Sequence, residues 1–256
     1  MSGPVPAGVT ALLCDVDDTL LPSEAPAFEA SVEVTNRFLD AHGIDRRVTS
    51  QELRTSYTGK NFRTTAGELA AAASVPVPDL DRWVAQEAEV MTAHLRATLT
   101  PDREVVGALT ELGGRLTLAA VSSSALARLE GSLTAAGLAG LLPVERRFSA
   151  EDSLPVPTSK PDPAVYRHAC QQLGIAPAEG LAVEDSVSGA TSAVGAGCPT
   201  IGIVAFVPAG ERRARRAALA GAGAGVLAVV SSWTGLTRLV TGGGTAGDAV
   251  GGQPVR

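Results

Sequence analysis

Two aspartates, Asp15 and Asp17, lie at the end of a short apolar segment that spans residues 11–16. In an extended chain, residues two positions apart point to the same side, so both carboxylates can face one site. Such a pair divides its work when one carboxylate stays ionised beside a cation and the other carries a proton. An acidic turn after a strand would explain the same residues, so this pattern alone leaves both interpretations open.

A second acidic pair, Glu184 and Asp185, follows another apolar segment, residues 181–183. Four carboxylates gathered at two strand ends would repel one another strongly unless a cation lay between them. Hard oxygen ligands of this kind suit Mg²⁺. The two pairs together therefore predict a magnesium site, and solvated surface loops are the alternative.

Hydroxyl and ammonium groups that suit an anion occur at two further places. Ser122 and Ser123 end a third apolar segment just before a predicted helix near Ala125, where hydroxyls and free backbone N–H groups favour phosphate. Serine is also a common helix cap without any ligand. Lys160 lies in a proline-rich loop, whose restricted φ angles would hold its ammonium in place beside a phosphoryl group.

These residues need a scaffold that brings several strand ends together. After position 101, apolar segments typical of strands alternate with helical patterns, which predicts an α/β fold, a doubly wound Rossmann-like parallel sheet that binds ligands beyond the carboxyl ends of its strands. The predicted strands are 11–16, 115–121, 147–150, 181–183, 200–204 and 226–230, and the predicted helices are 102–112, 125–136, 163–173, 188–196 and 210–219.

The region between the first strand and position 100 has a different character. Its apolar residues recur at helical spacing, with helices predicted over 27–41, over 50–57 and onward from Asp79. We therefore predict an α-helical cap domain over 21–99, inserted into a core made of 9–20 and 100–240. The glycine-rich segment 241–256 is predicted to be a disordered tail.

The composition excludes several classes of function. The 256 residues carry a net charge of −6 and 4% aromatic residues, which argues against a nucleic-acid partner. Three widely spaced cysteines indicate a reducing compartment, and we find neither a signal peptide nor a membrane span. The expected location is the cytoplasm, with no membrane partner, and the oligomeric state is not predictable from the sequence.

Taken together, the sequence resembles the haloacid dehalogenase-like hydrolases, in particular the subgroup of phosphoglycolate phosphatase and β-phosphoglucomutase relatives with a helical cap. The segment 15–19, with the sequence DVDDT, resembles the first motif of the family and Ser122 the second. Lys160 with the following PDP resembles the third, and Glu184-Asp185-Ser186 with Gly189 the fourth. The order and spacing of the four motifs carry the resemblance.

The resemblance implies a Mg²⁺-dependent phosphatase that acts on a small phosphorylated metabolite. Asp15 would be the nucleophile that forms an aspartyl phosphate, and Asp17 the general acid and then the general base. Asp15, the backbone carbonyl of Asp17, Glu184 and Asp185 would hold the metal. Ser122, Ser123 and Lys160 would bind the phosphoryl oxygens.

Specificity in such relatives comes from a cap loop, and Lys60 and Arg63 are the candidates for that role here, with solvated residues at a helix start as the alternative. Two alternatives remain: a phosphosugar mutase, and a catalytically idle protein that binds a phosphorylated ligand. Ala27 and Ala125 stand where the mutases carry a histidine and a lysine, which argues against the first. Asp18 stands where glycine is commonest in the family, and its role is not predictable from the sequence.

Overall fold

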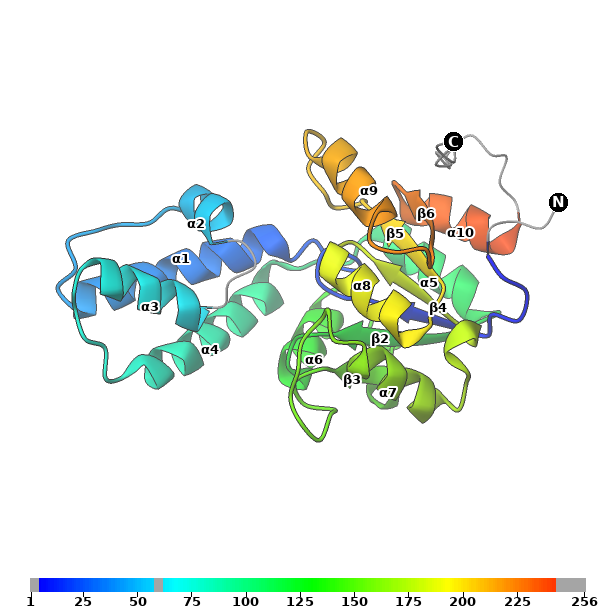
Figure 1. The fold of residues 1–256 in the computed structure, drawn as a ribbon, viewed down its shortest axis with the longest axis horizontal. Helices are drawn as coiled ribbons and strands as arrows, with labels where there is room; N and C mark the ends of the chain where they lie inside the picture. Colours follow the sequence, from blue (N-terminus) through cyan, green and yellow to red (C-terminus); the bar gives the residue numbers. More distant parts are fainter. Residues whose placement is uncertain (1–4, 58–61, 243–256) are drawn as a thin grey trace. The chain divides into compact units, whose positions relative to one another are not determined.

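One parallel sheet organises the larger part of the chain. The computed structural model describes residues 5–57 and 62–242, and within them six strands pair in the order β3-β2-β1-β4-β5-β6 (Figure 1). All neighbouring strands are parallel. The strands are β1 (Ala11–Cys14), β2 (Thr117–Ser122), β3 (Arg147–Ser149), β4 (Gly180–Glu184), β5 (Thr200–Ile203) and β6 (Val226–Val230).

The strand order creates a crevice beside β1. The chain runs from β1 outward through β2 to β3 and then returns to pair β4 with the other side of β1. At its carboxyl end, Cys14 of β1 is aligned with Ala120 on one side and Val183 on the other. The residues that follow β1, β2 and β4 therefore meet at the point where strand order reverses, which is where doubly wound sheets bind ligands.

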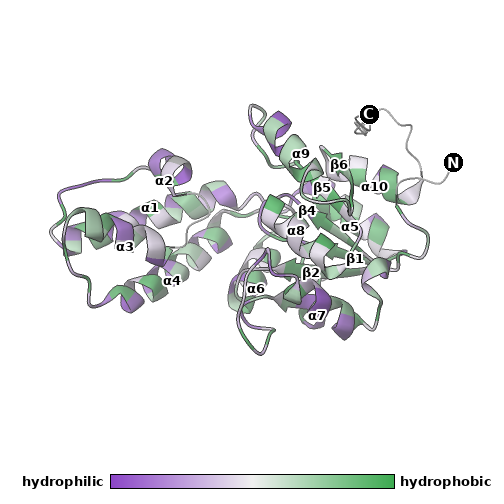
Figure 2. Ribbon diagram, in the orientation of Figure 1, coloured by the Kyte–Doolittle hydropathy of each residue, from purple (hydrophilic) through white to green (hydrophobic). Residues whose placement is uncertain are grey.

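The strands are buried on both faces, as a sheet covered by helices requires. Leu12 and Leu13 point to opposite faces, and both are fully buried. Leu13 shares a core cluster with residues of α7 and α8, and the strands are mostly green in Figure 2. The helices of this part are α5 (Arg103–Gly113), α6 (Leu126–Ala135), α7 (Ala164–Leu173), α8 (Val187–Ala196), α9 (Arg212–Ala220) and α10 (Trp233–Thr241), with 3-10 turns η1 (Val144–Arg146) and η2 (Pro177–Glu179).

The chain divides into two compact units, and the second, Ser23–Leu99, contains only helices among its described residues. Its core cluster centres on Phe38, whose ring meets the rings of Phe62 and Trp83 edge to face at centroid distances of 6.3 and 5.7 Å. Its helices are α1 (Glu24–Ala41), α2 (Ser50–Ser56), α3 (Phe62–Ala72) and α4 (Leu80–Thr98).

The predicted fold class, a doubly wound parallel sheet with an inserted helical cap, is confirmed. Two helices, α3 and α10, are absent from the prediction. Thr241, predicted to begin the tail, is the last residue of α10, and 243–256 lie outside the described residues. None of the helices in the described part of the chain is long and apolar enough to cross a membrane.

Trp233 links the unpredicted helix α10 to the loop after β1. Its side chain is fully buried, and its indole Nε1 donates a hydrogen bond to the carbonyl oxygen of Thr19 at 3.0 Å. We expect Trp233→Ala to lower the free energy of unfolding by about 3–5 kcal/mol, because it removes a large buried side chain. Urea titration followed by circular dichroism measures this change.

Trp233→Phe is the matched control for this prediction. It keeps most of the apolar volume and loses the donor to Thr19, so the expected loss is smaller, about 1–3 kcal/mol. Equal stability of Trp233→Ala and the wild type would contradict the assignment of Trp233 to the core.

Candidate active site

Three buried carboxylates lie together at the carboxyl ends of β1 and β4. Asp15 directly follows β1, Glu184 is the last residue of β4, and Asp185 comes next. One carboxylate oxygen from each residue lies within 4.8 Å of the others, and all three residues are buried. The parallel pairing of β1 with β4 therefore brings together residues that are about 170 positions apart in sequence.

The ammonium of Lys160 lies within this cluster. Its Nζ donates to Asp15 Oδ1 at 2.6 Å, to Glu184 Oε1 at 2.6 Å and to the carbonyl oxygen of Val121 at 2.9 Å. An ammonium has three protons, so these three acceptors use all of them. The backbone of the same loop is held because Lys160 N donates to Ser123 Oγ at 3.1 Å.

Burial dominates the electrostatics of this cluster. It raises the pKa of Asp15 above its usual range, although Lys160 opposes the shift, and it raises the pKa of Glu184 to about 7. Burial also raises the pKa of Asp185, and the charges of Asp15 and Glu184 add to the effect. For Lys160, burial alone lowers the pKa, but the two neighbouring carboxylates outweigh it and the pKa rises. A further positive charge would stabilise the ionised forms of all three carboxylates.

One oxygen of Glu184 is left for a ligand. Its Oε1 accepts from Lys160 and, at 2.5 Å, from the hydroxyl of Tyr166, whereas its buried Oε2 has no hydrogen-bond partner. A buried carboxylate oxygen without a donor is costly unless something electropositive reaches it. Each of Glu184, Asp15 and Asp185 offers a carboxylate oxygen, the hard ligand that a divalent cation prefers, so the donor set fits a metal ion such as Mg²⁺.

The carboxylate of Asp185 is oriented from two directions. Oδ1 accepts from the hydroxyl of Thr19 at 3.4 Å, and Oδ2 accepts from Arg215 Nη1 at 3.2 Å. Arg215, on α9, also donates to the backbone oxygen of Asp185 at 3.1 Å. The loop between Asp15 and Thr19 turns through Asp18, whose φ of 55° lies in the left-handed region. Glycine is favoured there, and aspartate is among the side chains that tolerate it.

The carboxylate of Asp17 does not join the cluster. Its Oδ1 accepts from Arg128 Nη2 at 2.9 Å, and its Oδ2 accepts from the hydroxyl of Ser124 at 2.9 Å. The side chain of Asp17 is 34% exposed, in contrast to the buried side chain of Asp15. The two aspartates of the first pair thus differ in environment, one desolvated beside an ammonium and one in contact with solvent.

The predicted anion-binding serines lie at the end of β2. Ser122 is buried, and its Oγ accepts from the backbone N–H of Ser124 at 3.0 Å, which leaves its hydroxyl proton to donate. Ser123 holds the backbone of Lys160, as described above. Helix α6 begins directly after this loop, and its first N–H group, that of Leu126, donates to Asp152 Oδ2 at 2.6 Å.

The two predicted cap residues are not brought to this cluster by any described contact. Arg63 is the second residue of α3, half exposed, and its Nη2 pairs with Asp81 Oδ1 of α4 at 2.6 Å. Lys60 lies outside the described residues. Their predicted role in specificity stays a prediction.

A sequence comparison decides the family. The family model for haloacid dehalogenase-like hydrolases matches residues 9–197. The chain belongs to this family. The matched region contains both acidic pairs, the serines after β2 and Lys160, so the resemblance stated from the motifs is confirmed.

One relative of this chain is named as a phosphatase. The chain is 45% identical to a phosphoglycolate phosphatase of Thiobacillus denitrificans over 60 residues, 23% of this chain and a quarter of that protein. It is 28% identical to Protein CbbY of Cereibacter sphaeroides over 195 residues, 74% of this chain and 81% of that protein. The structure of a HAD family hydrolase from Deinococcus radiodurans, with bound phosphate and sodium, has a TM-score of 0.67 and 26% identity, covering 93% of this chain and 97% of its own.

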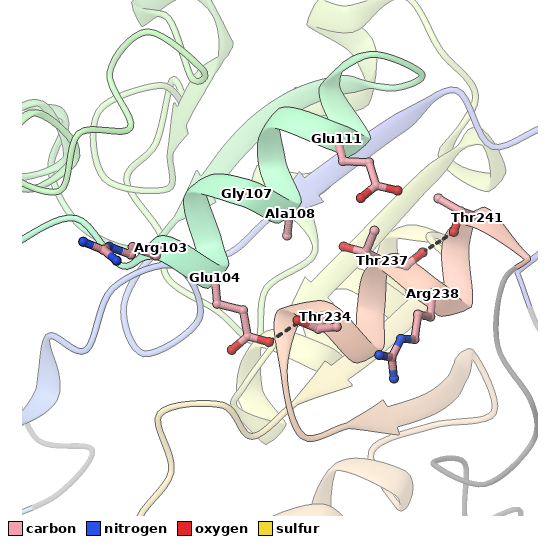
Figure 3. A pocket seen from close by; sticks show the side chains of 9 residues that line it. All are labelled: Arg103, Glu104, Gly107, Ala108, Glu111, Thr234, Thr237, Arg238 and Thr241. Atoms are coloured by element: carbon pink, nitrogen blue, oxygen red, sulfur yellow. Dashed lines mark hydrogen bonds between the residues drawn. The ribbon is translucent and has the colours of Figure 1, made fainter.

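A pocket of the hydrolase lies away from the acidic cluster, between α5 and α10. It has a volume of about 430 Å³, and Figure 3 shows Glu104 and Thr234 facing each other at one end, where Thr234 N donates to Glu104 Oε1 at 2.8 Å. Arg103 and Arg238 also line it. None of the predicted site residues does.

Sequence reasoning missed the residues that hold the predicted ones in place. None of the four motifs assigns a role to Tyr166, Arg128 or Arg215. Arg215 lies 18 residues beyond the end of the family match. Each contacts a carboxylate that is distant in sequence, so no local pattern signals the contact.

Gly189 forms the wall against which Glu184 packs, and this gives a direct test. A Cβ at Gly189 would lie 1.8 Å from Glu184 Oε2. We expect Gly189→Ala to lower the free energy of unfolding by about 1–3 kcal/mol, since Glu184 must leave its position. Gly195, on the same helix α8, is the matched control, because its nearest neighbour would be Pro163 Cβ at 3.6 Å.

Gly195→Ala is expected to raise stability by about 0.5–1 kcal/mol, the usual gain when alanine replaces a helical glycine. Thermal and urea unfolding of both variants provide the measurement. If the two substitutions changed stability alike, the close contact between Gly189 and Glu184 would not be a constraint on the site.

Proposed function

We propose that the protein is a Mg²⁺-dependent phosphatase that hydrolyses a small phosphorylated metabolite through an aspartyl phosphate. The observation that carries the proposal is the buried carboxylate of Asp15, which pairs with Lys160 and lies beside Glu184 and Asp185. Phosphoryl transfer depends chiefly on positioning and on charge neutralisation, and this cluster supplies both.

Asp15 and Asp17 share the work in this proposal. A carboxylate oxygen of Asp15 forms a bond to phosphorus while the bond from phosphorus to the ester oxygen breaks, and Asp17 gives its proton to the departing alcohol. Asp17 then accepts a proton from water as the water oxygen attacks the phosphorus of the aspartyl phosphate. Inorganic phosphate leaves, and Asp15 is regenerated. The ion pair of Asp15 with Lys160 favours the ionised carboxylate that a nucleophile needs, and the partly exposed Asp17 can exchange its proton with solvent.

The phosphoryl oxygens would be bound by Ser122 and Ser123, which precede α6, and by Lys160. Asp15, Glu184, Asp185 and the backbone carbonyl of Asp17 would hold Mg²⁺. A bound magnesium ion supplies charge neutralisation for the carboxylates and the phosphoryl oxygens. The unpartnered Oε2 of Glu184 supports this assignment.

The substrate class is inferred from the relatives. The phosphoglycolate phosphatase by name acts on a phosphate ester, and the hydrolase of Deinococcus radiodurans holds phosphate. For this chain we propose a small phosphomonoester, with Lys60 and Arg63 of the cap contributing to its recognition. A phosphosugar mutase is disfavoured because Ala27 and Ala125 cannot act as a proton donor or as a cation.

The nucleophile is tested by Asp15→Asn. The amide cannot form an acyl phosphate, so we expect release of inorganic phosphate from an aryl phosphate with Mg²⁺ to fall by on the order of a thousandfold or more. A phosphate assay measures the rate, and EDTA is expected to stop the wild type as well. Equal release by the two proteins, or indifference to EDTA, would refute the mechanism.

Magnesium binding is tested without turnover. At 100 times its dissociation constant, a ligand adds about 2.7 kcal/mol to the free energy of unfolding, which raises Tm by roughly 5–10 °C for a protein of this size. We expect such a shift with MgCl₂ in differential scanning calorimetry, and little shift in Asp185→Asn. NaCl at the same ionic strength is the control for screening. The same shift in the variant would remove Asp185 from the metal site.

A further inference from the structure

The segment after β2 holds the second aspartate of the site by both of its oxygens. Asp17 Oδ1 accepts from Arg128 Nη2, and Asp17 Oδ2 accepts from Ser124 Oγ, each at 2.9 Å. Arg128 is the third residue of α6, and Ser124 lies two residues before that helix. One short stretch of chain thus contributes both donors, 107 and 111 positions away from Asp17 in sequence.

These two contacts determine where the carboxylate points. A partly exposed aspartate can rotate about two side-chain bonds, and hydrogen bonds to both oxygens remove that freedom. Arginine remains charged at any ordinary pH, so its attraction to Asp17 persists across the working range. Each carboxylate oxygen has two lone pairs, so an oxygen that accepts from Arg128 or Ser124 can still exchange a proton with a substrate.

We propose that Arg128 is a positioning residue for the reaction, and that with Ser124 it aims the carboxylate of Asp17 at the oxygen of the leaving alcohol. This inference rests on the proposed function, in which Asp17 is the general acid. Arg128 meets the site through its ion pair with Asp17, so its effect on catalysis passes through that carboxylate.

The leaving group gives a readout that a merely structural role would not change. Nitrophenolate departs readily without a proton, whereas an alkoxide must be protonated as its bond to phosphorus breaks. Misplacing the general acid should therefore slow the cleavage of alkyl phosphates and leave the first step of aryl phosphates almost unchanged. The ratio kcat/KM reports that first step for both substrates.

The experiment compares Arg128→Met with the wild type on p-nitrophenyl phosphate and glycerol 1-phosphate. General acid catalysis typically contributes a factor of about 10²–10⁴ to the rate. Displacing the carboxylate of Asp17 should therefore lower kcat/KM for the alkyl ester by at least about tenfold. The loss for the aryl ester should stay within about twofold. Ser124→Ala is expected to show the same selectivity with a smaller loss. Arg213→Met, an exposed arginine on α9, is the matched control and should leave both substrates unaffected.

Asp17→Ala separates failure of this inference from failure of the proposed function. If Asp17→Ala lowers kcat/KM for both esters alike, or lowers it for neither, the general acid is misassigned and both proposals are refuted. The same holds if the wild type cleaves neither ester. If Asp17→Ala is selective but Arg128→Met lowers both esters equally, raises turnover or has no effect, only the role of Arg128 is overturned. In the double variant, Arg128→Met should add no further selective loss to that of Asp17→Ala.

Discussion

The burial of one ammonium among three carboxylates is the constraint on which the rest of the site depends. Lys160 uses all three of its protons on Asp15, Glu184 and a backbone carbonyl. Counted as ionised, the three carboxylates and one ammonium leave two negative charges in a buried space. Removing one partner of a buried pair typically costs about 3–5 kcal/mol, because the other charge is left uncompensated. The protein therefore needs three strand ends and the loop of Lys160 to converge before this cluster can exist.

A second layer of contacts keeps the carboxylates in place. Tyr166 of α7 and Gly189 of α8 limit Glu184 from two sides, and Arg215 of α9 holds Asp185. Helices that cover the sheet thus also orient the acidic side chains at the carboxyl ends of its central strands. Arg215 lies past the end of the family match, so part of the support for the site comes from a segment that the family model does not cover.

The fold was predictable where the chain itself carries the signal. Buried parallel strands read as unbroken apolar segments, and each is followed by the polar residues that its carboxyl end presents. Helix α3 was missed because small and polar residues fill most of its 11 positions, and only Phe62 and Leu69 are large and apolar. Helix α10 was missed because it has nine residues and adjoins a glycine-rich sequence. The contact between Asp17 and Arg128 spans 111 positions, and no local pattern encodes it. Strand ends and motifs mark Asp15, Glu184, Asp185 and Lys160 in the sequence, and the structure brings these four residues together.

The distribution of cations follows the same physics. Only two of the 21 lysines and arginines are lysines, and one of them is Lys160. At that position three acceptors surround a single nitrogen whose side chain is 5% exposed, and a compact ammonium satisfies them where a planar guanidinium would not fit. Arg128 and Arg215 lie at the rim, 26% and 31% exposed, where a fork of donors can reach one carboxylate from outside. In a chain whose other basic residues are almost all arginines, a lysine stands at position 160, where three acceptors surround a single nitrogen.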